Sequence, residues 1–549
     1  MAYSYRGLQR RLIVIAVIAV LFFSVPVSYA GINDDLHLID VQIQSQPNPV
    51  RVSGQAAYNV YEGVTQSRLD AKIALLKTTS ISSRFYQKWD YTLSQYVLVY
   101  DNFYSFTGLA GVTDTKLDIV TTVATQRLYR RGKTGTLETA TYLGAWWGGQ
   151  YRGVQASRDE QAILAAWGSD LQRIYVIDVP AGVTLVGGIA SPMEKDGEYR
   201  AGGAYQYYFS GAVNSWLVYA LYAPNYMKSY SGAITSAQKA GRSIATDLGA
   251  HMNQTRYEEI RFDDGAGEQP AQEGRFWLRG FGGNTDFGEV DGSSANSQTT
   301  GMSFGWQRMT QGRRATDKSR SYFGAMLGQG NSYQKYGTSN YGTGNVENKT
   351  QATVGGIYGL YVNRPDSSRS WYGNWALLHG SLKFSNTVPG ELGYGLKQEY
   401  NGIITMLTVE NGVSFRQPNG WVLEPQLQFS YTKIGQDDFN DHLGARVSLK
   451  QGDSFWGRLG VEARRTIARD SNRQSQYWAR FSYIHDFSNR NEVDIAGDRA
   501  SSELKRGYCI LAVGADLKLS PQYSIQGEVA QVFGSEKGFQ GNLALKYAW

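Results

Sequence analysis

The end of the chain, Phe539–Trp549, alternates between two kinds of residue. One parity is apolar or aromatic apart from a glycine: Phe539, Gly541, Leu543, Leu545, Tyr547 and Trp549. The other parity is more polar: Gln540, Asn542, Ala544, Lys546 and Ala548. Because successive side chains of a strand point to opposite faces, this segment predicts an amphipathic β-strand. A soluble sheet would place the apolar face on a protein core, whereas a transmembrane barrel would place it on lipid.

Segments of the same kind recur from Gly274 onward, separated by turns rich in Gly, Asn, Asp and Ser. They predict twelve strands: Arg275–Gly283, Thr299–Gln307, Ser321–Gly330, Thr350–Val362, Trp371–His379, Ile403–Phe415, Trp421–Tyr431, Trp456–Arg465, Gln476–Phe487, Cys509–Leu519, Tyr523–Phe533 and Phe539–Trp549. An even number of antiparallel strands is what a closed bacterial barrel requires. We therefore expect a twelve-stranded antiparallel transmembrane β-barrel over residues 274–549.

The strand at Trp421–Tyr431 shows which face would meet lipid. Its apolar parity holds Trp421, Leu423, Pro425, Leu427, Phe429 and Tyr431. Its other parity holds Val422, Glu424, Gln426, Gln428 and Ser430. Glu and Gln side chains without obvious partners suit a wet lumen and would be costly in a dry core. A soluble sandwich that buries the apolar face stays open as the alternative.

Residues 1–30 predict an export signal. Arg6, Arg10 and Arg11 form a basic start, and Leu12–Val25 is mostly apolar. Ser28-Tyr29-Ala30 offers small residues for cleavage after Ala30, so the mature chain is expected to leave the cytoplasm. A short N-terminal membrane anchor is the alternative.

Composition excludes several other classes of protein. The chain of 549 residues is too long for one compact core, which indicates at least two domains. Its net charge of +6 is small for this length and indicates no nucleic-acid partner. The only cysteine is Cys509, and the five histidines are far apart in sequence, so we expect no intrachain disulfide and no metal site.

The barrel region also carries motifs of a known family. They are Phe276-Trp277, Leu423-Glu424-Pro425-Gln426-Leu427, Tyr431, Asp437-Asp438-Phe439, Gly444-Ala445-Arg446-Val447, Gly457-Arg458-Leu459-Gly460 and the aromatic last strand. Together they resemble the translocator of type V autotransporters. The resemblance implies a barrel in the outer-membrane lipid, inserted by the outer-membrane assembly machinery with Trp549 as its recognition end. It also implies that the N-terminal half is the exported passenger, at the cell surface or secreted.

A helix is predicted between the two halves, over Lys228–Arg261. Apolar and small residues recur there at spacings of three and four, and small side chains suit a narrow pore. By resemblance this is the linker helix that threads the barrel lumen, and the alternative is an ordinary amphipathic helix of the passenger. Phe262–Glu273 reads as a flexible connection. The expected domains are thus a signal peptide (1–30), a passenger (31–227), a linker (228–273) and the barrel (274–549).

The passenger shows no fixed-period repeat, so we expect a compact α+β domain. Arg127–Arg130 reads as a strand and residues 153–157 as a short extended run. Arg158–Trp167 reads as a helix, and Arg173–Val179 as a further strand. An acidic, glycine-flanked segment at 196–199 follows it, where Asp196 and Glu198 would be exposed.

In order, these segments resemble the bacterial ADP-ribosyltransferase toxins of the cholera and pertussis type. The matching residues are Leu128-Tyr129-Arg130, Ser157, Ile174-Tyr175-Val176-Ile177, Glu198 with Ser191-Pro192 before it, and Gly202-Gly203. Gln155 and Ala156 depart from the Ser-Thr-Ser element of these toxins, and Asp196 stands where they have Glu or Gln.

The resemblance implies NAD as substrate, without a metal, and a host protein as acceptor. Arg130 would bind an NAD phosphate, and Ser157 would orient the site. Glu198 would stabilise the oxocarbenium-like centre while holding a ribose hydroxyl, and Asp196 would lie near the acceptor nucleophile.

Other assignments stay open. Arg51 could be the strand arginine, and Thr78–Ser82 or Thr121-Thr122 could be the second element. Arg130 could instead be a surface strand residue, Ser157 a helix N-cap, and Asp196 and Glu198 part of a solvated turn. The Trp146-Trp147 pair is expected to pack rather than bind. If the candidate residues have only these structural roles, the passenger would be a non-enzymatic adhesin or an inactive transferase fold. A third alternative, a porin-like channel with a soluble plug, is disfavoured by the linker helix and the size of the passenger.

Overall fold

The structure of the chain is a computed structural model. It describes residues 85–90, 95–100, 103–104, 118–133, 143–144, 146–190, 193–208, 212–259, 274–311, 319–337, 345–365, 367–470, 473–520 and 522–548. The predicted signal peptide, the residues Arg51, Thr78–Ser82 and Trp549, and the connection at 262–273 lie outside the described residues. The chain divides into two compact units: a first unit of Met1–Ile119, Arg158–Ala166 and Val186–Gln206, and a second unit of Val120–Ser157, Trp167–Leu185 and Tyr207–Trp549.

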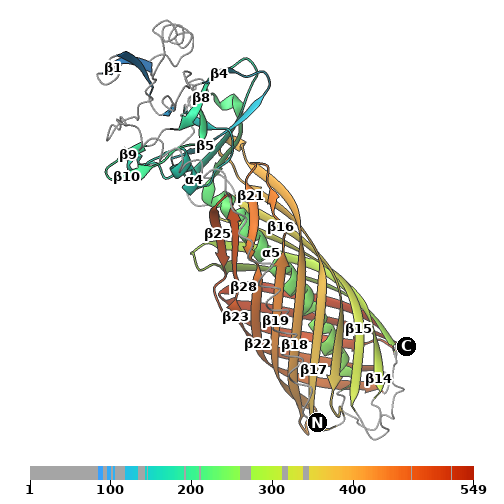
Figure 1. Cartoon of the computed structure of the whole chain (residues 1–549). Coiled ribbons are helices and arrows are strands. Elements are labelled where there is room, and N and C mark those ends of the chain that lie inside the picture. Colours follow the sequence, from blue (N-terminus) through green and yellow to red (C-terminus); the bar gives the residue numbers. More distant parts are fainter. Residues whose placement is uncertain are drawn as a thin grey trace, which may run out of the picture. The chain divides into compact units, whose positions relative to one another are not determined.

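Twelve antiparallel strands close into a barrel within the described part of the second unit (Figure 1). They are β13 (Gly274–Gly288), β14 (Ser294–Gln311), β15 (Arg320–Tyr336), β16 (Val346–Val362), β17 (Arg369–Val388), β18 (Leu396–Arg416), β19 (Trp421–Gly435), β22 (Asp453–Asp470), β23 (Arg473–Ser488), β26 (Tyr508–Lys518), β27 (Tyr523–Gly534) and β28 (Glu536–Ala548). Each contains or overlaps one predicted strand, in the predicted order, and most are longer than predicted. The twelve-stranded barrel is therefore confirmed.

The barrel closes by pairing its first strand with its last. β13 and β28 run antiparallel in register from Arg275↔Ala548 to Phe287↔Glu536. This ladder removes both open edges of the sheet, so the backbone polar groups of the edge strands are paired with protein.

The two faces of the strands divide as predicted. Along β19 the residues alternate without a break, with Trp421, Leu423 and Leu427 exposed on the outside. Glu424 and Gln426 point inward and are 1% and 2% exposed. On β28 the outward residues are Phe539, Leu543, Leu545 and Tyr547, all exposed. An apolar outer belt flanked by aromatic residues is the surface that lipid requires.

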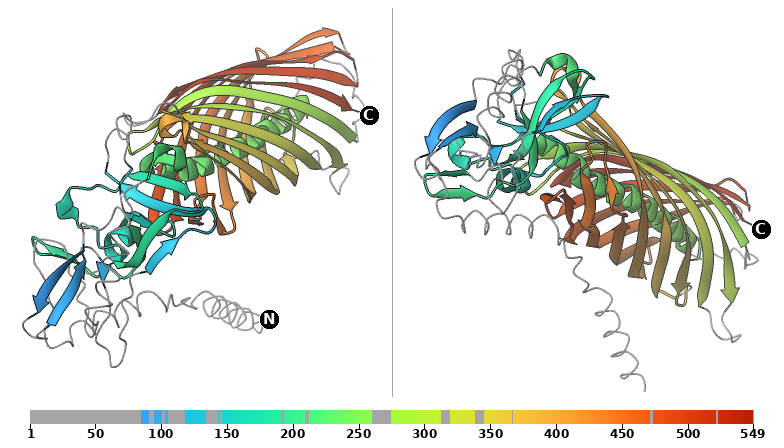
Figure 2. Two further views of the ribbon diagram at one scale, coloured as in Figure 1. Left: turned by 90° about the horizontal axis from the view of Figure 1, so that it is seen from above. Right: turned by 45° about the horizontal axis from the view of Figure 1, so that its top comes forward.

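A single long helix, α5 (Ala223–Glu259), runs inside the barrel, as Figures 1 and 2 show. At 1.5 Å per residue it is about 55 Å long, which exceeds the thickness of a bilayer core. It begins five residues earlier than predicted, because Pro224 is favourable in a first helical turn. Among the described residues, no helix combines the length and apolar character that crossing a membrane would require.

Four further strands form a small sheet that the sequence did not predict. They are β20 (Phe439–Asn440), β21 (Arg446–Gln451), β24 (Arg490–Ile495) and β25 (Asp498–Glu503), paired in that order. β20 and β21 lie in the connection between β19 and β22, and β24 and β25 in that between β23 and β26. We call these four strands the rim sheet.

The second unit also contains part of a larger passenger sheet, and we call this part the base sheet. It comprises β12 (Leu217–Tyr222), β7 (Arg173–Val179), β5 (Gln126–Gly132) and β6 (Trp146–Gly148), with β7 between β12 and β5. The predicted strand at Arg173–Val179 is confirmed. Trp147 is fully buried and donates from its indole N–H to the carbonyl of Gly144 at 3.1 Å, so it packs as expected.

The extended run predicted at 153–157 is wrong. Residues Val154–Glu160 form helix α4, and only Ala165–Trp167 form a further short 3-10 helix, η2. A distant carboxylate explains the difference, because Asp498 Oδ1 accepts the N–H of Val154 at 2.8 Å, at the first residue of α4. Negative charge stabilises a helix N-terminus, and this partner is 344 residues away in the sequence.

The first unit holds short strands. β1 (Phe85–Asp90) pairs with β2 (Gln95–Tyr100), and β3 (Phe103–Tyr104) pairs with the end of β8 (Thr184–Ala190). β9 (Met193–Lys195) and β10 (Glu198–Arg200) form a hairpin. The boundary strands β4 (Asp118–Thr121) and β11 (Tyr205–Tyr208), with the 3-10 helix η3 (Asn214–Trp216), complete the described elements of the passenger. Strands and short helices together agree with the expected α+β class.

The outer belt yields a test of the lipid-facing assignment. Leu543 lies on β28 midway between Phe539 and Tyr547 and is 63% exposed. We expect Leu543→Arg to lower the free energy of unfolding by about 2–4 kcal/mol, because a charge near the bilayer midplane is poorly solvated. Urea unfolding of the protein in lipid vesicles measures this. Leu543→Ala is the matched control, and equal stabilities of the two variants would contradict a lipid-facing Leu543.

Candidate functional site

The inside of the barrel, with α5 along it, is the first candidate site. Small residues of α5 let the helix come close to the wall. A Cβ on Gly232 would lie 2.7 Å from the ring of Tyr336, and one on Gly241 would lie 2.6 Å from Ile404 Cδ1. A Cβ at either position would force side chains of the wall to shift, so these glycines allow the helix to lie close to the barrel.

Apolar contacts hold one side of the helix. Ile234, Ala237, Ile244 and Leu248 are at most 1% exposed and belong to one buried cluster with residues of the barrel wall. α5 lies mainly against β14, β15, β16 and β17 in this region. The helix therefore runs through the lumen closer to this part of the wall and does not lie on the central axis of the barrel.

Ion pairs between α5 and inward-pointing residues of the barrel form a ladder along the helix. They are Lys228–Glu289, Lys239–Glu536 at 2.7 Å, Arg242–Asp486 at 2.5 Å, Asp247–Arg279 at 2.9 Å, Arg256–Glu424 and Glu258–Arg275 at 3.1 Å. Most of these side chains are nearly or completely buried. Removing one partner of such a pair leaves an unpaired buried charge, so each pair fixes the helix in one register.

These pairs change the interpretation of the lumen. The sequence predicted a wet lumen because Glu424 had no obvious partner. In the structure Glu424 binds Arg256 and accepts from the hydroxyl of Ser414 and, at 2.9 Å, from the amide of Gln426. The charge of Glu424, the one carboxylate of β19, is therefore balanced by Arg256 of the helix and is not left to water.

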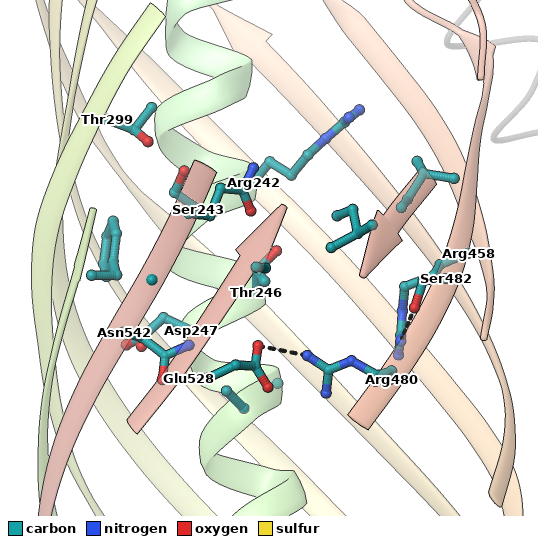
Figure 3. Close-up of a pocket in the computed structure, with 18 of the residues that line it drawn as sticks. Arg242, Ser243, Thr246, Asp247, Thr299, Arg458, Arg480, Ser482, Glu528 and Asn542 are labelled. Atoms are coloured by element: carbon teal, nitrogen blue, oxygen red, sulfur yellow. Dashed lines mark hydrogen bonds and ion pairs between the residues drawn. The ribbon is translucent and has the colours of Figure 1, made fainter. Parts of the chain in front are cut away.

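Water has room on the opposite side of α5. A cavity of about 130 Å³ lies between the helix and the β22–β28 part of the wall (Figure 3). The helix contributes small or polar residues to it, among them Ser243, Thr246 and Gly249. Arg480 crosses toward Glu528 at 2.7 Å, as the dashed line in Figure 3 shows. The cavity is polar and lined by paired charges, which is the setting in which buried water is held.

Sequence reasoning missed this ladder. Its signal was present in two places, because α5 carries Lys239, Arg242, Asp247 and Arg256 among small residues, and the inward parity of the strands carries Glu and Arg. Which charge meets which depends on how the strands are ordered around the helix. A matching of opposite charges could have been expected, but not the individual pairs.

Arg130, the predicted NAD-phosphate ligand, lies on β5 of the base sheet and is partly buried. Its cross-strand neighbour is Tyr175 of β7, and its guanidinium lies against Gly144. Gly144 has φ +94°, a conformation that favours glycine. Arg130 therefore packs within the second unit instead of on an open strand surface.

Ser157 lies in α4 and is completely buried. Its N–H donates to the carbonyl of Gly153 at 2.9 Å, and its hydroxyl has no hydrogen-bond partner among the described residues. The resemblance placed this residue on a strand, and the structure places it on a helix.

Asp196 and Glu198 lie on the β9–β10 hairpin of the first unit. Asp196 and Gly197 have φ of 52° and 81°, which matches the two-residue turn that Asp-Gly favours. Asp196 is exposed at the tip of this turn. The structure therefore brings these two candidates together, whereas Arg130 and Ser157 belong to the second unit.

The carboxylate of Glu198 is held by several donors. Arg200 Nε donates to Oε1 at 2.9 Å, and the backbone N–H groups of Ala165 and Ala166 donate to Oε2 at 2.8 and 3.3 Å. Burial opposes ionisation, but the hydrogen bonds from Arg200 and the two amides hold the pKa of Glu198 below its ordinary value. Arg200 also reaches Asp159 at 2.5 Å. Glu198 is thus an oriented anion, not a freely solvated side chain.

Within the part of the chain that the structure describes, no three His, Cys, Asp or Glu side chains are grouped so as to hold a metal ion.

Comparison with known proteins defines the class of the barrel. Residues 276–530 match the family model described as Autotransporter beta-domain. The Pertactin autotransporter of Bordetella parapertussis (strain 12822) is 27% identical over 183 residues, which cover 33% of this chain and 19% of that protein. The Adhesin BmaC autotransporter of Brucella suis biovar 1 (strain 1330) is 24% identical over 345 residues, 59% of this chain and 9% of that protein. This chain therefore spans less than a fifth of the length of these two relatives.

Among solved structures, the β domain of the Bordetella autotransporter BrkA aligns with a TM-score of 0.40 and 20% identity, over 50% of this chain and 100% of that structure. The family match over residues 276–530 and the closed barrel support a type V secretion translocator in the C-terminal part of this chain. The barrel lies in the outer membrane, and the passenger is at the cell surface.

The charge ladder generates a test on the Arg256–Glu424 pair, whose side chains are 0% and 1% exposed. We expect Glu424→Gln to lower the free energy of unfolding by about 3–5 kcal/mol, because Arg256 would keep only Glu410, at 3.7 Å, as a counter-charge. The double variant Arg256→Met/Glu424→Gln should lose less than the sum of the two single variants. Urea unfolding in lipid vesicles gives all three values.

The exposed pair Arg446–Asp438, at 2.8 Å with side chains 57% and 43% exposed, is the matched control. Its removal is expected to cost at most about 1 kcal/mol. Additive single and double variants at Arg256 and Glu424 would show that the ladder does not act as a coupled pair.

Proposed function

We propose that this protein is an autotransporter that carries its own N-terminal region out through its barrel and displays it at the cell surface. The observation that carries the proposal is the path of the chain. β12 of the base sheet ends at Tyr222, and α5 begins at the next residue and runs down the lumen.

The two ends of α5 are held at opposite ends of the barrel. Near its start, Tyr226 and Tyr230 both donate to Asp441, in the loop that joins the rim-sheet strands β20 and β21. At its other end, Glu258 pairs with Arg275 and Lys546, at the beginning of β13 and the end of β28. The chain therefore passes through the whole barrel, with the base sheet at one end and the start of β13 and the end of β28 at the other. Outer-membrane lipid surrounds the belt, and the outer-membrane assembly machinery is the proposed route of insertion.

Display at the surface is testable on intact cells. With an epitope tag inserted after Ala30, we expect antibody to bind before any permeabilisation and external proteinase K to remove the signal. A tag placed in the connection at 260–273 is the internal control, because this connection precedes β13 at the end of the barrel opposite to the base sheet. It should bind antibody only after permeabilisation. An N-terminal tag that also needs permeabilisation would contradict the proposal.

For the chemistry of the passenger we propose mono-ADP-ribosyl transfer from NAD. In that reaction the bond between nicotinamide and ribose breaks, nicotinamide leaves with the electron pair, and an acceptor nucleophile attacks the ribose carbon and loses its proton. Glu198 would stabilise the cationic centre, and Asp196 would lie near the acceptor. The supporting observation is the orientation of the Glu198 carboxylate by Arg200 and two backbone amides, since preorganised charge is what such a centre needs.

A non-enzymatic adhesin is the second candidate. It is favoured by the relative from Brucella suis, which carries the word adhesin in its name and matches over 59% of this chain. The helical setting of Ser157 also favours it, because the transferase resemblance needs a strand at that position. A host protein would be the binding partner in this case and the acceptor in the enzymatic one.

NAD hydrolysis by the purified full-length protein in detergent separates the two candidates. If the passenger is a transferase, we expect Glu198→Gln to lower the rate of nicotinamide release by at least about a hundredfold, as loss of one stabilising charge in a site of this kind does. Asp159→Asn is the matched control, because it loosens the same Arg200 but leaves the Glu198 carboxylate in place. A wild type that is as inert as Glu198→Gln with every acceptor tested would favour the adhesin.

A further inference from the structure

β7 is buried on both of its faces. Tyr175, Ile177 and Val179 pack in a passenger cluster with Leu128 and Trp147. A strand that is apolar on both faces needs a layer of protein against each of them, and the passenger cluster covers only one face of β7.

The second face of β7 belongs to a buried cluster that also contains residues of the rim sheet. Ile174 and Val176, which are 1% and 0% exposed, belong to a different buried cluster. The rim-sheet strands and the β20–β21 loop contribute to the same cluster, through Leu443, Ala445, Val447, Val493, Ile495 and Ala500. The start of α5 joins it through Tyr226 and Tyr230. The base sheet and the rim sheet thus share one apolar core.

A buried ion pair crosses this contact. Arg131 Nη2 of β5 lies 2.7 Å from Asp498 Oδ2 at the start of β25, and the two side chains are only 3% and 9% exposed. Arg131 also donates to the hydroxyl of Tyr151 at 2.7 Å and to the carbonyl of Arg152 at 3.1 Å. Every donor nitrogen of Arg131 therefore has an acceptor in the contact or beside it. Such an arrangement is specific to one docked position, because either charge alone would be left buried and unpaired.

The backbone at residues 153–154 also lies close to the β24–β25 turn. The other oxygen of Asp498 accepts the N–H of Val154, and a Cβ on Gly153 would lie 2.6 Å from the carbonyl oxygen of Ala496. Ala496 and Gly497 form the β24–β25 turn, with φ of 51° and 89°. The turn thus presents Asp498 to the passenger at a distance that only glycine at 153 permits.

A second connection joins the base sheet to the loop between β17 and β18. The N–H of Ala220 in β12 donates to the carbonyl of Tyr394 at 3.0 Å, and Leu221 forms a bridge with Gly390. Arg173 of β7 pairs with Glu391 of the same loop. Docking therefore involves three separate connections of the barrel and does not depend on α5 alone.

We propose that the rim sheet is a docking surface for the passenger's own base sheet, and that it keeps the passenger on the barrel even when the chain between them is cut. The passenger then works in place at the cell surface, and its partners are molecules that can reach that surface, not targets inside a distant cell. This inference rests on the proposed display function and goes beyond it, since display alone does not determine whether the passenger is released.

The test uses the full chain in the outer membrane, with an epitope tag after Ala30 and a site for a specific protease inserted at 209–211, between β11 and η3. Cleavage on intact cells cuts the chain between β7 and β12, so the tagged fragment is then held only by the β7–β12 ladder and by the docking contacts with the barrel connections. We expect the tagged fragment to stay on washed cells. In Arg131→Met we expect it to dissociate at least about tenfold faster, because Asp498 is left buried without its counter-charge.

Arg127→Met is the matched control. Arg127 lies on the same strand and pairs with Asp178 at 2.8 Å, but this pair lies within the base sheet and its side chains are 40% and 33% exposed. Its removal should leave retention unchanged. Asp498→Ala provides the same test from the barrel side, in case Arg131→Met is not displayed.

The outcomes separate the two proposals. A wild-type fragment that washes off as soon as it is cut overturns the docking inference, as do equal dissociation rates for Arg131→Met and Arg127→Met. In both cases the tag is seen at the surface before cleavage, so display stands. A tag that cannot be reached before cleavage counts against display itself.

Discussion

The structure depends on one constraint: inside a bilayer, each backbone N–H and C=O must find its partner within the protein. The ladder between β13 and β28 meets this constraint by joining the first barrel strand to the last. Once the sheet is closed, the alternation of every strand acquires a fixed meaning. Residues such as Leu543 face lipid, and residues such as Glu424 face the lumen. Closure therefore creates the polar interior that the rest of the chain has to fill.

A barrel of this size is too wide to be filled by its own side chains, and α5 fills part of it. The helix solves two problems at once. Its small residues Gly232 and Gly241 allow close packing on one side, and its charges neutralise the inward carboxylates and guanidinium groups. The remaining polar cavity shows that the fit is one-sided. The specificity of the lumen thus comes from paired charges, whereas its tightness comes from glycine and alanine.

The base sheet is contacted by the connections between barrel strands. Ile174 and Val176 share one buried cluster with residues of the rim sheet, so the base sheet and the rim sheet contribute to a common core. The two residues proposed for NAD binding and the two proposed for catalysis are divided between the two units. Arg130 and Ser157 lie in the unit that contains the barrel, and Asp196 and Glu198 lie in the other. Asp498 also explains why residues 154–157 are helical, through its hydrogen bond to Val154.

The sequence by itself determined the twelve barrel strands, their faces and the helix, because period-two and period-3.6 patterns depend only on neighbouring residues. The rim sheet was not predicted, because its strands are short and its apolar residues, such as Val493 and Ile495, are buried only in a cluster formed by distant parts of the chain. The sequence also missed the partner of each lumenal charge. Arg256 and Glu424 are 168 residues apart, and Arg131 and Asp498 are 367 apart. Only the tertiary structure decided these pairs, because closure of the barrel and the path of α5 through it determine which distant residues meet.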